Sequence, residues 1–177
     1  MGTLPRRRFT LADLLLLIAA AGVASAMTRA VMVRQTLRGP VDALLSVPVA
    51  GACWVALCAS IALIPIRLRR PRPGWALLRD RPGFVASIAV LSGLVLETFN
   101  DLPLMLNYPI GVESWLYAAS FPSNVAPLVA VSWLVLAMGG RWSPGPESDW
   151  VDRAGLALGV LWLVGFAAAV VASFWLL

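Results

Sequence analysis

Five long apolar stretches constrain this chain more than any other feature of its sequence. They cover residues 11–28, 43–64, 84–106, 118–138 and 151–177. Each approaches or exceeds the roughly 20 residues needed to cross about 30 Å of hydrocarbon. Only 13% of the 177 residues are charged, whereas a soluble domain carries about 25%. We therefore predict an all-α fold, a polytopic membrane helix bundle in which residues 1–177 form a single membrane domain with five transmembrane helices.

The arginines outside these stretches predict how the chain is threaded. Three precede the first stretch, six lie between the second and third, and two flank the last connection. Arg29, Arg34 and Arg38, in the first loop, are the minority on the other side. Because basic residues are retained on the cytoplasmic side, this distribution predicts an N-in/C-out orientation. The use of Arg in place of Lys throughout is typical of a GC-rich bacterial genome, so we expect a multi-pass protein of the bacterial inner membrane.

The first apolar stretch also has features of an export signal. A basic start is followed by an apolar run, and Ala24-Ser25-Ala26 fits an A-x-A cleavage site. R-R-R-F-T-L also resembles a twin-arginine signal. Asp13 interrupts the front of the apolar run, which favours an uncleaved anchor helix. Whether residues 1–26 are ever removed stays open at this point.

The sequence resembles two groups of membrane proteins. The segment R-R-F-T-L-A-D-L-L-L-L, Arg7 to Leu17, resembles the opening of many bacterial polytopic membrane proteins that carry no agreed activity. This resemblance implies a membrane anchor and says nothing about chemistry. The chain is also similar to the translocator-protein family in size, number of spans and its eight Trp residues. Its first loop, R-A-V-M-V-R-Q-T-L-R-G-P, has no Trp and one Pro, which departs from that family's W-x-P-P-type loop and disfavours membership.

A polar patch interrupts the outer end of the third stretch, in V-L-E-T-F-N-D-L-P-L-M-L. Glu97, Asn100 and Asp101 share one helical face through their i,i+3 and i,i+4 spacing. An unpaired carboxylate inside a membrane is costly, and such groups usually face the bundle and pair. We therefore expect Arg29, at the same side of the membrane, to pair with Glu97 or Asp101 and hold two helices together. The alternative is a proton- or cation-binding site made of Glu97, Asn100 and Asp101. Ser123 and Asn124, at the start of the fourth stretch, are expected to add hydrogen-bonding groups near this patch.

Small residues at a spacing of four mark candidate helix-packing faces. Gly155 and Gly159 create a flat strip near the start of the last stretch, and Ala52 and Ala56 form a similar strip in the second. Such strips let helix backbones approach closely. We expect them to pack within the chain, and an interface between subunits is the alternative.

The arginine-rich loop between the second and third stretches is a candidate contact for anionic lipids. Arginine near a membrane surface attracts anionic headgroups at about 1 kcal/mol each. Trp75, Leu77 and Leu78 suggest a short segment lying on that surface. A topology signal alone explains the same charges equally well. The candidate residues are Arg67, Arg69, Arg70, Arg72, Arg79 and Arg81.

The residue content excludes several classes of function. The chain has no His, which removes serine–histidine triads and imidazole metal sites. Cys53 and Cys58 lie about 140° apart around a helix, which disfavours a shared metal or redox site. Catalytic and nucleotide-binding motifs are absent from the sequence. We expect no catalytic residues, no metal, no cofactor and no nucleic-acid partner.

These observations lead to two functional hypotheses. The first is a non-catalytic accessory or structural membrane component that acts through helix packing, with the lipid bilayer as its environment. It would assemble either with itself or within a larger membrane complex. The alternative is a small proton- or cation-coupled transporter or channel that uses an outer-facing site of Glu97, Asn100 and Asp101.

Overall fold

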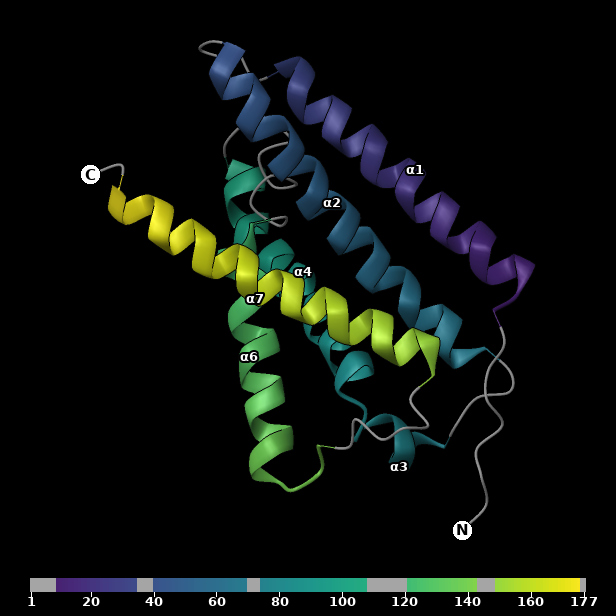
Figure 1. Ribbon diagram of the computed structural model, residues 1–177. Helices are drawn as coiled ribbons and strands as arrows, with labels where there is room; N and C mark the ends of the chain where they lie inside the picture. The colour runs from purple at the N-terminus through teal and green to yellow at the C-terminus, as the bar shows by residue number, and fades with distance from the viewer. Residues whose placement is uncertain (1–8, 35–39, 70–73, 108–120, 143–148, 176–177) are drawn as a thin grey trace.

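The computed structural model describes residues 9–34, 40–69, 74–107, 121–142 and 149–175. These residues form helices and turns and no strand, so the all-α prediction is confirmed for the described chain. The helices are α1 (Leu11–Arg34), α2 (Pro40–Leu68), α3 (Trp75–Leu78), α4 (Pro82–Asn107), α6 (Pro122–Met138) and α7 (Trp150–Trp175) (Figure 1). The five long helices correspond to the five apolar stretches, and α3 is a single additional turn.

Four of the helices are long and apolar enough to cross a membrane. Their candidate spans are Leu11–Ala30, Val49–Leu68, Pro82–Asp101 and Trp150–Val171. The fifth, α6, has 17 residues and a length of about 26 Å, which is somewhat less than the roughly 30 Å of a hydrocarbon core. By the hydropathy of its helices, the chain is a multi-pass membrane protein.

The helix boundaries differ from those expected at the ends of α1 and α2 and at the start of α6. α1 and α2 continue to Arg34 and Leu68, whereas the apolar stretches end at residues 28 and 64. Hydropathy marks where a segment becomes polar, but backbone hydrogen bonding carries a helix further into the polar region. α6 begins at Pro122 instead of residue 118. A proline is well placed in the first turn, because its missing N–H would have no helical partner there.

The helices pack unequally. α4, α6 and α7 contact one another, α2 packs on α4 and α7, and α1 packs on α2. Figure 1 shows α1 beside α2 at one edge of the molecule, while α7 crosses obliquely in front of α4 and α6. The main core lies mostly among α2, α4, α6 and α7 and includes Trp54, Val90, Val129 and Trp162, and α1 adds Ala24 to it. α1 is thus a peripheral helix attached to a four-helix core.

Arg67 and Glu97 mark the two ends of the core. At the Arg67 end, the end of α2 meets the start of α7, and the start of α4 meets α6 through a hydrogen bond from Trp133 Nε1 to the Pro82 carbonyl oxygen, 3.0 Å long. At the Glu97 end, Glu97 of α4 lies beside Asn124 near the start of α6. These contacts make α4 antiparallel to α6.

A local hydrogen-bond pair starts α1. The Thr10 N–H donates to Asp13 Oδ2 at 3.0 Å, and the Asp13 N–H donates to Thr10 Oγ1 at 3.3 Å. This reciprocal arrangement satisfies two backbone donors at a helix start, as in a capping box. Phe9 packs edge-on against Trp150 with 5.0 Å between ring centroids, which ties the start of α1 to the start of α7. Asp13, which interrupts the apolar run in the sequence, therefore has a structural role.

Glycines set the distance between α4 and α7. A Cβ at Gly83 would collide with the backbone carbonyl of Asp152, and one at Gly155 would collide with the carbonyl of Gly83. Gly159 lies under the ring of Trp133. The two glycines expected to form a packing strip thus face neighbouring helices of the same chain. On α2, Ala56 is buried but Ala52 is exposed, so these two alanines do not form one buried strip.

We predict that Gly83→Ala destabilises the protein by about 1–3 kcal/mol, which is typical of overpacking. The added methyl group would lie 2.8 Å from the Asp152 carbonyl carbon, and backbone atoms there cannot move aside cheaply. Thermal unfolding in mild detergent measures the effect. Gly22→Ala is the matched control, because nothing lies within 4 Å of its added Cβ. Equal unfolding temperatures for the two variants would contradict the close contact.

Candidate functional site

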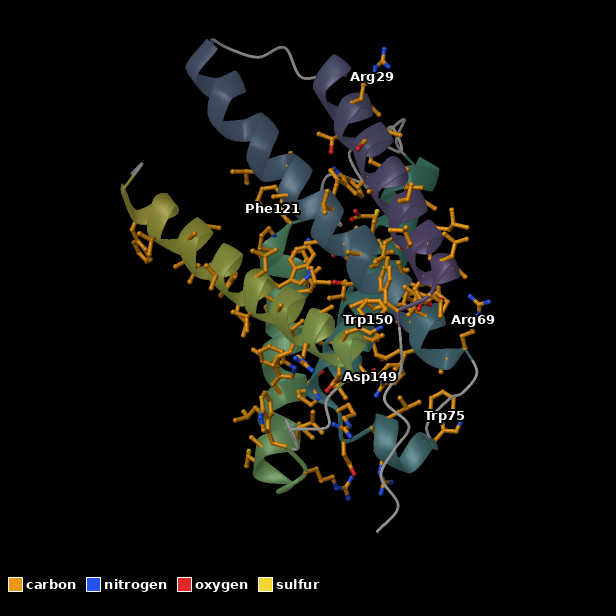
Figure 2. All side chains as sticks on the ribbon, turned by 45° about the vertical axis from the view of Figure 1, so that its right-hand side comes forward. Arg29, Arg69, Trp75, Phe121, Asp149 and Trp150 are labelled. Carbon is orange, nitrogen blue, oxygen red and sulfur yellow. The ribbon has the colours of Figure 1, made fainter. Side chains whose placement is uncertain are left out.

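A group of charged side chains is buried where α2, α4 and α7 meet. Arg67 at the end of α2 forms an ion pair with Asp149, which directly precedes α7, and the Nη1–Oδ2 distance is 2.7 Å. Both side chains are largely buried, with 6% and 14% of their surface exposed. Figure 2 shows Asp149 and Trp150 together at this end of the bundle. Removing two charges from water is costly unless they pair closely, so this short contact is required for both to be buried.

Asp152 adds a second carboxylate to this group. It is buried, and Arg67 and Arg81 are the charged side chains that act on it. Its carboxylate also lies next to the backbone N–H groups of Gly83 and Phe84 in the first turn of α4. Those donors have no partner within the helix, and a negative charge is favoured beside them. Asp152 on α7 therefore places a carboxylate beside the start of α4.

The four charged groups balance one another. Arg67 and Arg81 are formally positive, and Asp149 and Asp152 are formally negative. We call these four residues the charge cluster. A narrow space too small to hold a water molecule lies beside it, lined by Arg67, Asp152 and apolar neighbours such as Leu63 and Phe84. The direct ion pair of the cluster, Arg67–Asp149, joins the end of α2 to the start of α7, and Asp152 and Arg81 add one charge of each sign near it.

The expectation that Arg67 contacts anionic lipids is wrong. Arg67 is buried and ion-paired, so it is not available to lipid headgroups. Arg81 is half-buried beside Asp152. Arg69 and Arg79 are exposed, and Figure 2 places Arg69 and Trp75 at this same end of the molecule. Arg70 and Arg72 lie outside the described residues.

We predict that breaking the Arg67–Asp149 pair from either side destabilises the protein by about 3–5 kcal/mol, because an uncompensated charge is left buried. Arg67→Met and Asp149→Leu would be compared with the double variant by thermal unfolding in detergent. The double variant should lose less than the sum of the single losses. Arg79→Met is the control, because its 3.7 Å pair with Asp80 is exposed and such pairs contribute about 0–1 kcal/mol. Additive losses would show that the two residues act independently.

The polar patch of α4 has a different partner from the one expected. Asn124 Nδ2 of α6 donates a hydrogen bond to Glu97 Oε1 at 3.1 Å. Glu97 and Asp101 are half-buried, whereas Asn100 is exposed. Arg29 is exposed near the end of α1, and Figure 2 shows it at the opposite end of the molecule from Trp75 and Trp150. Among the described residues, no ion pair joins Arg29 to Glu97.

We predict that Asn124→Ala lowers the stability of the bundle by about 1–2 kcal/mol, the range for interhelical hydrogen bonds in membranes. Glu97→Gln should have a smaller effect, because the glutamine keeps an oxygen that accepts the bond. Asn100→Ala is the matched control for loss of an exposed amide. The measurement is the unfolding temperature in one detergent. If Asn124→Ala and Asn100→Ala behave alike, the Glu97–Asn124 contact does not stabilise the bundle.

Several residues of these contacts were not found from the sequence. Asp149 and Asp152 are three residues apart around the start of α7, and acidic residues at that position are a recognised signal for a helix start. Their opposite charge to the nearby arginine-rich loop was a second signal. Trp133 lies deep in an apolar stretch, where its indole N–H needs a polar partner, and that partner is the Pro82 carbonyl oxygen. Its ring also contacts Trp142, with centroids 5.5 Å apart.

The described residues contain no group of three or more Cys, Asp or Glu side chains arranged to hold a metal ion. Comparison of the chain with protein-family models, with curated proteins and with solved structures finds no match. The function must therefore be argued from the contacts of this chain alone.

Proposed function

We propose that this protein is a non-catalytic accessory or structural component of the bacterial inner membrane that acts through helix packing. The orientation proposed is N-in/C-out, which places the Arg67 end in the cytoplasm. The arginine distribution supports this, because most of the basic residues flank the helices at that end.

This proposal is supported by the polar groups inside the bundle, because they form contacts within and between its helices. Asp13 caps α1, Arg67 binds Asp149, and Glu97 accepts from Asn124. Each contact fixes the start of a helix or joins two helices. Glu97, one of the groups that a carrier would need for its substrate, is thus engaged in joining α4 to α6.

The apolar faces left outside the core are where a partner would bind. In the candidate span of α1 only 11% of the residues are buried, and in that of α7 only 17%, against 44% in α4. Ile18 and Val164 are exposed by 57% and 59% on these two helices. In a membrane such faces contact lipid or another helix. The proposed partner is a second copy of the chain or a larger membrane complex.

A proton- or cation-coupled carrier is the second candidate. It is favoured by the half-buried pair Glu97 and Asp101, which lie one helical turn apart. Glu97 does not line the space beside the charge cluster. It also does not line a groove along α4 and α6 that is formed by residues such as Val85 and Leu128. The hydrogen bond from Asn124 also occupies one of its oxygens. These contacts favour the packing role.

Photo-crosslinking in the native membrane tests the packing role. A photo-reactive residue would replace Ile18 on α1 or Val164 on α7. We expect discrete protein adducts from at least one of them, with masses that distinguish a second copy from another protein. Val131 of α6 is the matched control, because it is equally exposed, at 58%, on a helix that packs more fully. Equal adducts from all three sites would indicate random collisions and contradict the proposal.

Flux measurements test the carrier. Purified protein in vesicles should show no proton or cation flux above that of empty vesicles, and Glu97→Gln should leave this unchanged. A flux that Glu97→Gln abolishes, with crosslinks absent from α1 and α7, would replace the packing role by the carrier.

A further inference from the structure

A groove runs along the outside of α4 and α6 near the Arg67 end. Its volume is about 390 Å³. Val85 and Ile88 of α4 and Leu128 of α6 are among its apolar lining residues. Ser132 of α6 and Ser92, the lining residue farthest along α4 from Arg79, are polar. Trp75 of α3 and Arg79 lie at its mouth. Both α4 and α6 are apolar helices of the membrane domain, so the groove opens toward the bilayer.

The length of the groove suits a hydrocarbon chain. From Phe84 to Ser92, α4 rises about 12 Å, which is close to the roughly 15 Å of hydrocarbon in one leaflet of a 30 Å core.

The mouth of the groove is suited to an anionic headgroup. Arg79 is 64% exposed, and its nearest carboxylate, on Asp80, lies 3.7 Å away. An exposed pair at this distance is weak, so the guanidinium remains able to bind a phosphate. Trp75, also 64% exposed, has the amphipathic ring that favours the boundary between hydrocarbon and headgroups.

We propose that this groove binds one anionic phospholipid, with an acyl chain between α4 and α6 and its phosphate on Arg79. Trp75 covers the part of the lipid between the acyl chain and the phosphate. The site is independent of the proposed packing role, because it lies on α3, α4 and α6 and does not use the exposed faces of α1 or α7. It replaces a diffuse contact of the whole arginine-rich loop by one defined position.

Native mass spectrometry of the full chain in mild detergent tests the headgroup contact. Phosphatidylglycerol and phosphatidylcholine with identical acyl chains would be titrated separately. We expect phosphatidylglycerol to bind more tightly, and Arg79→Gln to weaken it about fivefold, the effect of one headgroup charge contact. Binding of phosphatidylcholine should not change. Arg141→Gln, another exposed arginine beyond the end of α6, is the control and should bind as the unmodified protein does.

A second variant tests the acyl chain. Ser92 is exposed, so Ser92→Trp fills the end of the groove farthest from Arg79 without entering the core, and it should weaken both lipids. Val135→Trp is its control, because Val135 is exposed by 64% on α6 and does not line the groove. The proposal is overturned if Arg79→Gln and Arg141→Gln lose equal affinity, or if Ser92→Trp binds both lipids normally. It is also overturned if glycerol 3-phosphate displaces the lipid, because the headgroup alone would then be sufficient.

Discussion

The close contact between the starts of α4 and α7 is the constraint on which the rest of the bundle depends. Gly83 and Gly155 allow the two backbones to touch, and this brings Asp152 against the first N–H groups of α4. The same approach places Asp149 within reach of Arg67 on α2. A carboxylate buried in the protein is costly without partners. The backbone contact and the charge cluster therefore require each other, and three helices are fixed at one end as a result.

The features that could be predicted from the sequence are those that depend on neighbouring residues. The five helices follow from apolar length, and the short turn at Trp75–Leu78 follows from apolar residues set among arginines. The start of α1 likewise depends on Thr10 and Asp13, which are three residues apart. Helix ends were less predictable, because backbone hydrogen bonding continues past the point where the side chains become polar, as at the end of α2.

The lateral order of the helices could not be predicted in this way. The charge rule assigns a residue to one side of the membrane, but it does not say which helices are neighbours on that side. Arg29 was expected near Glu97 only because the two residues were assigned to the same side of the membrane. α1 instead packs on α2, whereas α4 packs on α2, α6 and α7. Arg67 and Asp149 are 82 residues apart in the chain, and only the packing of α2 against α7 reveals them as partners.

The charge cluster and the groove proposed to bind a lipid meet at Phe84. Phe84 lines the groove, and its N–H lies next to the Asp152 carboxylate. Its side chain is buried between the two sites. A ligand that binds only the folded state stabilises it by mass action, so a lipid in the groove would stabilise the first turn of α4 in the position that the cluster needs. The Arg67 end would then be held by both protein charge and lipid, while the exposed face of α1 and the second half of α7, which projects from the core in Figure 1, stay available to a partner.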